Sequence, residues 1–309
     1  MRKILAPVLI GLGCFLVTIG AVAWFWAPAQ VERTPLDTDN TTHLSGEAQV
    51  AGGADLSLQA TPVLAWSVNQ VDSDASTDDV AVWDTSLCVV RDKGGIDGCV
   101  DADDPEGRLI SAETDVFATD RHTALTVPNG DYVPAGTPQQ EGLQNKWPFG
   151  AEQKTYPVWD GMIGGAVDAT YQRTEDIDGL ETYVYRADAS ATGVNVIGDV
   201  PGDYQQTAEY YIEPRTGAII KQVVHQERTA DGIGKILVMD LAFTDDQVQT
   251  NVDDARTNIQ TLRLIEDIVP LVGFVGGGLV LLAGVILLLT GRRRTPTPAE
   301  EPTEAVPVA

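Results

Sequence analysis

Two long apolar segments, one near each end of the chain, constrain its fold more than any other feature. They are Ile4–Trp26 and Ile268–Thr290, and neither contains a charged residue. A helix needs about 20 apolar residues to cross the ~30 Å hydrocarbon core of a bilayer, and each segment is long enough. We therefore expect two transmembrane helices, at residues 4–26 and 268–290.

Basic residues at both ends predict the orientation of these helices. Arg2 and Lys3 precede the first segment, and Arg292–Arg294 follow the second. Because positive charge stays on the cytoplasmic side, residues 1–3 and 291–309 should be cytoplasmic and residues 27–267 extracytoplasmic, at the plasma membrane. The tail after Arg294 is rich in Pro and Glu, and we expect it to be disordered.

The first segment has a second interpretation. Ala27-Pro28-Ala29 fits the small-residue pattern of a signal-peptide cleavage site. A signal peptide has an apolar region of only about 7–15 residues, which is shorter than Ile4–Trp26. The length favours an uncleaved anchor and leaves cleavage as the alternative.

Charge and cysteine usage agree with an extracytoplasmic domain. The chain has 45 Asp and Glu against 20 Lys and Arg, and this acidic excess disfavours binding to nucleic acid. Cys88 and Cys99 flank a Gly94-Gly95 turn signal, so a hairpin would bring their sulfur atoms together. Oxidising conditions outside the membrane would preserve a structural disulfide between them.

The sequence pattern of residues 27–267 predicts mainly β structure. Short apolar or alternating runs are separated by explicit turns such as Pro214-Arg215-Thr216-Gly217, which predicts an antiparallel meander in one domain. A short helix near 253–267 should lead into the second span and end or bend at Pro270. The expected strands are Leu56–Trp66, Val80–Val90, Asp115–Ala118, Arg121–Val127, Ala166–Tyr171, Glu181–Arg186, Ala208–Glu213, Ala218–Gln226 and Gly234–Phe243.

Catalytic and cofactor signatures are not evident in the sequence. It lacks a His-Glu-x-x-His zinc motif, a Gly-x-Ser-x-Gly elbow and a phosphate-binding Gly-rich loop, so we expect no enzymatic activity and no cofactor. One acidic loop offers oxygen ligands for calcium but does not match an EF-hand, and a solvated loop is the simpler interpretation. Its acidic residues are Asp101, Asp103, Asp104 and Glu106.

The segment 147–160 holds the densest group of aromatic residues outside the spans. These side chains could line an apolar cavity, stack on sugars, lie at the bilayer interface or fill a corner of the core. In the second span, Gly273 and Gly277 are four residues apart, which permits close packing against the first span or in a dimer. The candidate cavity residues are Trp147, Phe149, Tyr156 and Trp159.

Several segments together resemble the actinobacterial family labelled "porin PorA", a group of two-helix cell-envelope proteins. The resemblance covers nearly the whole chain and is distinctive in combination rather than in any single motif. It rests on Met1–Gly11, Thr34–Asp37, Trp147–Gly150, Lys154–Asp160, Ala169–Tyr171, Ile177–Tyr183, Glu213–Gly217 and the second apolar segment.

The resemblance implies an elongated, barrel-like outer domain able to bind lipid, in a protein similar to those implicated in making lipomannan and lipoarabinomannan. It supplies no catalytic residues. Our leading hypothesis is a non-enzymatic membrane protein that binds a membrane lipid or lipid-linked glycan and supports envelope assembly. The alternatives are a scaffold for envelope glycosyltransferases and a pore. A pore fits poorly, because charges such as Lys221, Glu227 and Asp240 lie in the expected strands.

Overall fold

A computed structural model describes residues 2–52 and 56–291 of the chain. The chain divides into two compact units, Glu32–Gln260 and a second unit formed by Met1–Val31 with Thr261–Ala309. Arg292–Arg294 and nearly all of the predicted cytoplasmic tail lie outside the described residues. Each unit is therefore considered by itself.

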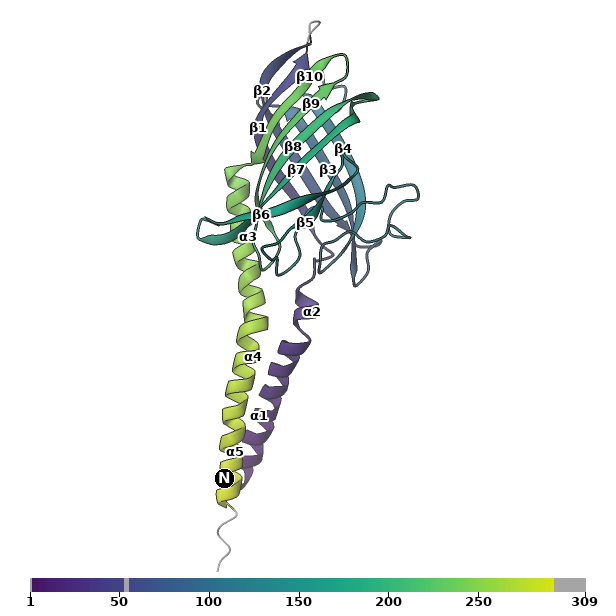
Figure 1. Cartoon of the computed structure of the whole chain (residues 1–309). Coiled ribbons are helices and arrows are strands. Elements are labelled where there is room, and N and C mark those ends of the chain that lie inside the picture. The colour runs from purple at the N-terminus through teal and green to yellow at the C-terminus, as the bar shows by residue number, and fades with distance from the viewer. Residues whose placement is uncertain (1, 53–55, 292–309) are drawn as a thin grey trace, which may run out of the picture. The chain divides into compact units, whose positions relative to one another are not determined.

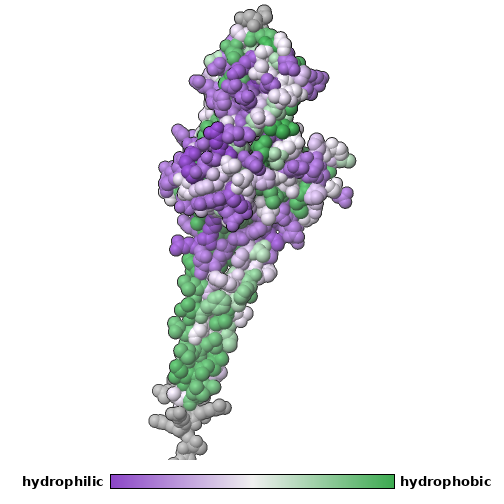
Figure 2. Space-filling view, viewed as in Figure 1, coloured by the Kyte–Doolittle hydropathy of each residue, from purple (hydrophilic) through white to green (hydrophobic). Residues whose placement is uncertain are grey.

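The unit formed by the two ends of the chain is helical. Its helices α1 (Arg2–Phe25) and α5 (Gly277–Gly291) contact each other extensively, and both candidate membrane spans have mostly exposed apolar side chains. Figure 2 shows this apolar surface in green. The remaining helical elements are α2 (Pro28–Val31), η1 (Leu264–Ile268), α4 (Val269–Leu271) and η2 (Val272–Gly276).

The predicted short helix before the second span is longer and starts earlier than expected. Helix α3 runs from Asp245 to Arg263, and the chain stays helical as far as Thr290. Pro270 does not end the helix, because π-helical turns on both sides of it change the hydrogen-bond register. The Val269 N–H, for example, donates to the Leu264 carbonyl five residues earlier, so the helix continues past the proline.

The unit Glu32–Gln260 is built on one ten-stranded antiparallel sheet, which confirms the predicted mainly β fold (Figure 1). The strand order is β4-β3-β2-β1-β10-β9-β8-β7-β6-β5, so two meanders meet where β1 pairs with β10. The strands are β1 (Asp39–Gly52), β2 (Ser57–Asp72), β3 (Val80–Arg91), β4 (Leu109–Asp120), β5 (Tyr156–Asp160), β6 (Gly165–Ile177), β7 (Leu180–Ile197), β8 (Val200–Ile212), β9 (Ile219–Ala230) and β10 (Gly234–Phe243).

Two strands and one turn differ from the sequence prediction. Strand β1 was not predicted, because its first half is polar and carries little apolar alternation. It forms a strand because it pairs with β2 on one side and β10 on the other. Residues 121–127, predicted as a strand, form a turn with isolated bridge residues, and β5 lies within the aromatic segment.

The sheet rolls up, but its two edge strands do not pair with each other in the described part of the chain. A single bridging path connects them instead. The Thr126 N–H donates to the Gly142 carbonyl at 3.0 Å, and the Leu143 N–H donates to the Pro157 carbonyl of β5 at 2.8 Å. On the other side, Val127 donates to Ala118 of β4 at 2.9 Å. The roll is therefore closed at one level by the loop between β4 and β5.

The two faces of the rolled sheet differ in chemistry. Alternation along the strands places small and apolar side chains such as Ala48, Val63 and Ala208 on the inner face, where each is at most 1% exposed. The outer face of β6–β10 carries ion pairs, including Arg173–Glu209 at 3.2 Å, and Figure 2 shows much of this surface as hydrophilic. The core of this unit is thus enclosed by its own sheet.

Helix α3 covers the rim of the sheet at the ends of β7 and β9. Val252 and Ala255 of the helix pack against Leu180 and Ile220. The Asn251 side chain also donates hydrogen bonds to the carbonyl groups of Ile219 and Ile220. These contacts fix the first turns of the helix to the sheet.

Candidate functional site

The four predicted aromatic residues occupy two different environments. Trp147 is 0% exposed and Tyr156 is 7% exposed, and both belong to the core inside the roll. The Trp147 ring lies 5.5 Å from Tyr185 and 4.9 Å from Tyr210, between ring centroids. Phe149 and Trp159 are partly exposed. The segment therefore fills the closed end of the roll with part of its aromatic set.

The segment around Trp147 is held by the turn between β8 and β9. The Trp147 N–H donates to the Gly217 carbonyl at 2.9 Å, and the Ala151 N–H donates to the Pro214 carbonyl at 2.7 Å. Gly217 has a φ of +73°, and a Cβ there would lie 2.1 Å from the Trp147 carbonyl oxygen. Only glycine accommodates both the backbone angle and this close approach.

Glu213 stabilises that turn from inside. It is 3% exposed, and its carboxylate accepts hydrogen bonds from the N–H groups of Arg215 and Thr216 at 2.9 and 2.8 Å. The Thr216 hydroxyl donates a third bond at 2.5 Å. A buried carboxylate with three donors is well compensated for its loss of water. Glu213 thus explains the local shape of the Glu213–Gly217 turn.

Lys146 and His122 lie on Phe149. The Lys146 Nζ is 3.4 Å from the centre of the Phe149 ring, and the His122 ring stacks on the same ring at 6.0 Å. Burial lowers the pKa of the Lys146 ammonium to about 7, although the Glu213 carboxylate acts in the opposite direction. An amine with such a pKa changes its charge near neutral pH.

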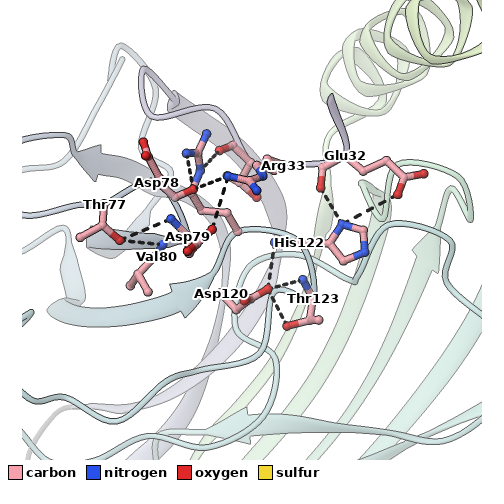
Figure 3. Close-up of polar contacts among 11 residues, drawn as sticks. Glu32, Arg33, Thr77, Asp78, Asp79, Val80, Asp120, His122 and Thr123 are labelled. Atoms are coloured by element: carbon pink, nitrogen blue, oxygen red, sulfur yellow. Dashed lines mark hydrogen bonds and ion pairs between the residues drawn. The ribbon is translucent and has the colours of Figure 1, made fainter. Parts of the chain in front are cut away.

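The first residues of this unit are fixed to the same end of the sheet (Figure 3). Arg33 and Arg121 each donate to the Asp78 carbonyl at 2.9 Å, and Arg121 also donates to the Thr34 carbonyl at 2.8 Å. The His122 Nδ1 lies 2.7 Å from the Glu32 carbonyl oxygen. The chain that enters from α2 is therefore held against the ends of β3 and β4.

Asp120 organises the turn that carries His122. One of its carboxylate oxygens accepts from the N–H groups of His122 and Thr123 and from the Thr123 hydroxyl, at 2.7–3.0 Å. Burial works to raise the pKa of Asp120, but these hydrogen bonds together hold it below its ordinary value. The carboxylate therefore stays ionised and keeps the turn in place.

A polar network crosses the inner face further along the roll. The Tyr204 hydroxyl donates to Asp160 at 2.8 Å, and Gln226 links Gln206 to the Arg228 guanidinium. Burial, followed by the Asp160 charge, raises the pKa of Tyr204. Asp160 is 5% exposed and also accepts backbone N–H groups of the β5–β6 turn. The network joins that turn to β8 and β9.

Cys88 and Cys99 form the predicted disulfide, with 5.8 Å between their Cα atoms. It holds the loop after β3 against the outer face, where Ile96 and Val100 pack on a cluster with Trp66 and Val90.

The weak calcium candidates lie in the same loop, and the described residues contain no group of three or more His, Cys, Asp or Glu arranged to hold a metal. Asp104 forms an ion pair with Arg108 at 2.5 Å, and hydrogen bonds from the Arg108 side chain and backbone lower the pKa of Asp104 to about 2. Asp101, Asp103 and Glu106 lie around it in the same loop.

The predicted packing glycines lie at the contact between the two long helices. A Cβ at Gly273 would lie 2.6 Å from the Gly20 Cα, and one at Gly277 would lie 2.9 Å from Val17. Gly13 and Gly284 make similarly close approaches. Small residues therefore allow the two backbones to pack closely, as in many membrane helix pairs.

The structure combines a rolled antiparallel sheet with two helices that are long and apolar enough to cross a membrane. The family model described as "Porin PorA" matches residues 5–286, and the chain belongs to this family. No curated protein matches the chain. Among solved structures, a DUF1329 family protein from Desulfovibrio piger ATCC 29098 is similar at 9% identity, over 76% of this chain and 93% of that chain. Its TM-score of 0.15 is too low to inform the fold.

Sequence reasoning missed several residues of this region. Lys146 and Glu213 carry no motif for a ligand, and their surroundings follow only from the contact between two distant segments. The inner polar network was also missed, because Asp160, Tyr204 and Arg228 are far apart in the sequence. One signal was available, since Trp147–Gly150 and Glu213–Gly217 both contributed to the family resemblance. In the structure these two segments pack directly against each other.

Proposed function

We propose that this protein is a non-enzymatic, membrane-anchored protein of the cell envelope whose sheet unit binds a lipid or lipoglycan precursor. It would support assembly of lipomannan- or lipoarabinomannan-type polymers. The observation that carries the proposal is the incomplete closure of the roll. Among the described residues, strands β4 and β5 do not pair directly and are linked only through a few bridges of the loop between them, such as Thr119–Thr126, Leu125–Leu143 and Leu143–Val158. The face that they enclose is largely apolar and aromatic.

An unpaired seam gives an acyl chain a route to the inner face. Parting the seam at the bridging loop breaks few backbone hydrogen bonds, whereas opening a closed barrel breaks a whole strand ladder. A ligand chain would then exchange contact with water for contact with apolar side chains. The charged outer face would remain in water throughout.

The sheet unit is joined to both candidate spans by short stretches of chain, which favours a membrane lipid as the ligand class. Val31, the last residue of α2, immediately precedes Glu32, the first residue of the sheet unit, and α3 leads directly into the second span. We infer that both ends of the chain are cytoplasmic and the sheet unit is extracytoplasmic, because basic residues flank the spans and the unit holds a disulfide. The unit would then act on the outer side of the plasma membrane.

Photo-crosslinking tests the proposal on the full chain. Protein reconstituted in nanodiscs would be irradiated with lipids that carry a diazirine on the acyl chain, and labelled peptides would be mapped by mass spectrometry. Labelling of inner-face peptides from residues 32–260, in addition to the helices, is expected. Labelling confined to the helices would contradict lipid binding by the sheet unit.

A scaffold for envelope glycosyltransferases is the second candidate. It is favoured by the dense packing at the closed end, where Leu143, Trp147 and Tyr185 are all 0% exposed. A scaffold needs a rigid surface and no cavity. Stable co-isolation of a glycosyltransferase, together with labelling confined to the helices, would support this function over lipid binding.

Pore formation, suggested by the family description, has weaker support. A strand that crosses a bilayer needs an apolar outer face, whereas the outer face of β6–β10 carries Arg186–Asp188 and Lys235–Glu227 ion pairs. We expect no conductance when the purified chain is added to planar bilayers. Stepwise single-channel currents would instead support pore formation as the function.

A further inference from the structure

Two buried hydrogen-bond donors at the closed end of the roll lack an acceptor, and a partly exposed lysine beside them in the sequence has no hydrogen-bond partner among the described residues. The Trp147 Nε1 and Gln144 Nε2 atoms are buried, and neither has a hydrogen-bond partner. Lys146, between them in the sequence, contacts the Phe149 ring, but no hydrogen bond or ion pair joins it to another described residue. Buried polar groups are nearly always paired, so an unpaired set of donors in one short segment needs a chemical explanation.

The nearest carboxylate does not supply the missing acceptor. Glu213 attracts the Lys146 ammonium electrostatically, but its oxygens already accept from Arg215 and from Thr216. His122, which stacks on the Phe149 ring, is engaged with the Glu32 carbonyl group. The hydrogen-bond partner of Lys146 therefore comes from outside the described residues, as water or as a ligand with oxygen acceptors.

We propose that Gln144, Lys146 and Trp147 form the binding site for an anionic phosphodiester headgroup, carried by the lipid or lipid-linked precursor that enters the roll. Phosphodiester oxygens accept several hydrogen bonds and carry a negative charge, which matches two neutral donors and one ammonium. This inference rests on the proposed function and names the headgroup of its ligand.

The acidic surface of the protein does not prevent such binding. The Glu213 carboxylate accepts three hydrogen bonds, and the Glu32 carboxylate lies 3.8 Å from the His122 Nδ1. Arg121 adds a positive charge and donates to the carbonyl groups of Thr34 and Asp78. The ion-paired acidic residues of β6–β10 lie on the outer face. Their long-range repulsion is screened within about 8 Å at physiological ionic strength.

Headgroup binding should be linked to proton uptake. Lys146 is partly exposed, but the desolvation of its ammonium lowers the pKa to about 7, so most of the amine is neutral at pH 8. A bound anion favours the charged form and raises this pKa, so the protein takes up a proton as the ligand binds. Glu213, Glu32 and His122 are the other titratable groups that face Lys146 or Phe149.

The test compares two diazirine lipids that differ only in the headgroup. The full chain in nanodiscs would be labelled with phosphatidylglycerol or with the matched diacylglycerol, and inner-face peptides from residues 32–260 would be quantified. We expect at least tenfold more labelling by phosphatidylglycerol, and Lys146→Met should remove this excess. Lys235→Met, which removes an exposed, ion-paired lysine of the outer face, is the matched control and should change nothing.

Each outcome separates the headgroup site from the function on which it rests. Equal labelling by the two lipids, or no effect of Lys146→Met, would overturn the headgroup site and leave lipid binding intact. No labelling of the sheet unit would overturn both. Inorganic phosphate at 10 mM should compete weakly; complete competition would assign the site to free phosphate instead.

Proton uptake provides a readout that needs no variant. Calorimetric titration of the full chain with short-chain phosphatidylglycerol at pH 8, in two buffers of different ionisation enthalpy, should reveal net uptake approaching one proton. The phosphodiester does not titrate near this pH, so the proton is assigned to the protein. Binding without uptake would overturn the role of Lys146.

Discussion

Two loops pack on the same sheet, one on each face, and they are held by opposite means. The loop between Cys88 and Arg108 lies on the outer face and is attached by a disulfide. The segment around Trp147 enters the roll and is held by backbone hydrogen bonds to the β8–β9 turn and by aromatic packing. The first is acidic and mostly exposed, whereas the second contains the completely buried Trp147.

The difference indicates that the number of side chains a loop buries determines how the loop is attached to the sheet. The outer loop buries only a few side chains, such as Ile96 and Val100, so its own packing stabilises it little. A covalent link compensates by restricting the unfolded chain. The inner segment buries Trp147 and Leu143 completely and needs no covalent link. Its attachment depends instead on a close backbone approach at Gly217.

The largest effect should come from breaking that close approach. We expect Gly217→Ala to cost roughly 3–5 kcal/mol or to prevent folding, because a Cβ combines an unfavourable positive φ with a clash against the Trp147 carbonyl. Tryptophan-fluorescence melting of the full chain in detergent measures the change. Gly232→Ala is the control, since φ is +72° there with open space around the added atom, and about 1 kcal/mol is expected. Equal losses for both variants would contradict the role of the contact.

Removing the disulfide should have the next largest effect. Cys88→Ala with Cys99→Ala should destabilise the sheet unit by about 2–3 kcal/mol, because the closed loop is short. The same melting assay applies, and reduction of the native protein should give a similar shift. Cys14→Ala, which changes the free cysteine, should leave the melting temperature unaltered. A loss of stability as large as that caused by Gly217→Ala would show that the attachment of the outer loop contributes as much to stability as the attachment of the inner segment.

A smaller effect is expected at the carboxylate that supports the inner attachment. Glu213→Gln keeps the shape of the side chain but leaves one acceptor oxygen for three donors. We expect a cost of about 1–3 kcal/mol from the donors left without a partner. Hydrogen exchange of the Arg215 and Thr216 amides should accelerate locally. Unchanged exchange there would show that the turn holds its shape without Glu213.

The smallest effect should come from the ion pair in the outer loop. The Arg108 hydrogen bond lowers the pKa of Asp104 to about 2, so the pair contributes stability above the ordinary carboxyl pKa of about 3.8. This contribution is lost progressively as the pH falls toward 2, where the carboxylate is protonated in the unfolded chain and about half protonated in the folded protein. Arg108→Gln should therefore lower the melting temperature slightly at pH 6 and by much less at pH 2. An equal shift at both pH values would point to lost packing.

The two loops also differ in how far the sequence predicted them. The disulfide followed from two cysteines around a Gly-Gly turn, because a hairpin is a local structure that brings nearby residues together. The position of Trp147 did not follow, and its segment was compatible with a cavity, a sugar site, the bilayer interface or the core. Its burial depends on Gly217, which is 70 positions later in the chain, and no local pattern carries that information.

The sequence alone determined the features that depend on composition along a short stretch. Apolar length predicted the two spans, alternation and turns predicted antiparallel β structure, and cysteine spacing predicted the disulfide. Only the tertiary structure decided that β1 pairs with β10, that the sheet rolls without its edge strands pairing in the described part of the chain, and that Lys146 lies on the Phe149 ring. Strand order and burial arise from contacts between distant residues, and many arrangements of the same strands satisfy the same local pattern.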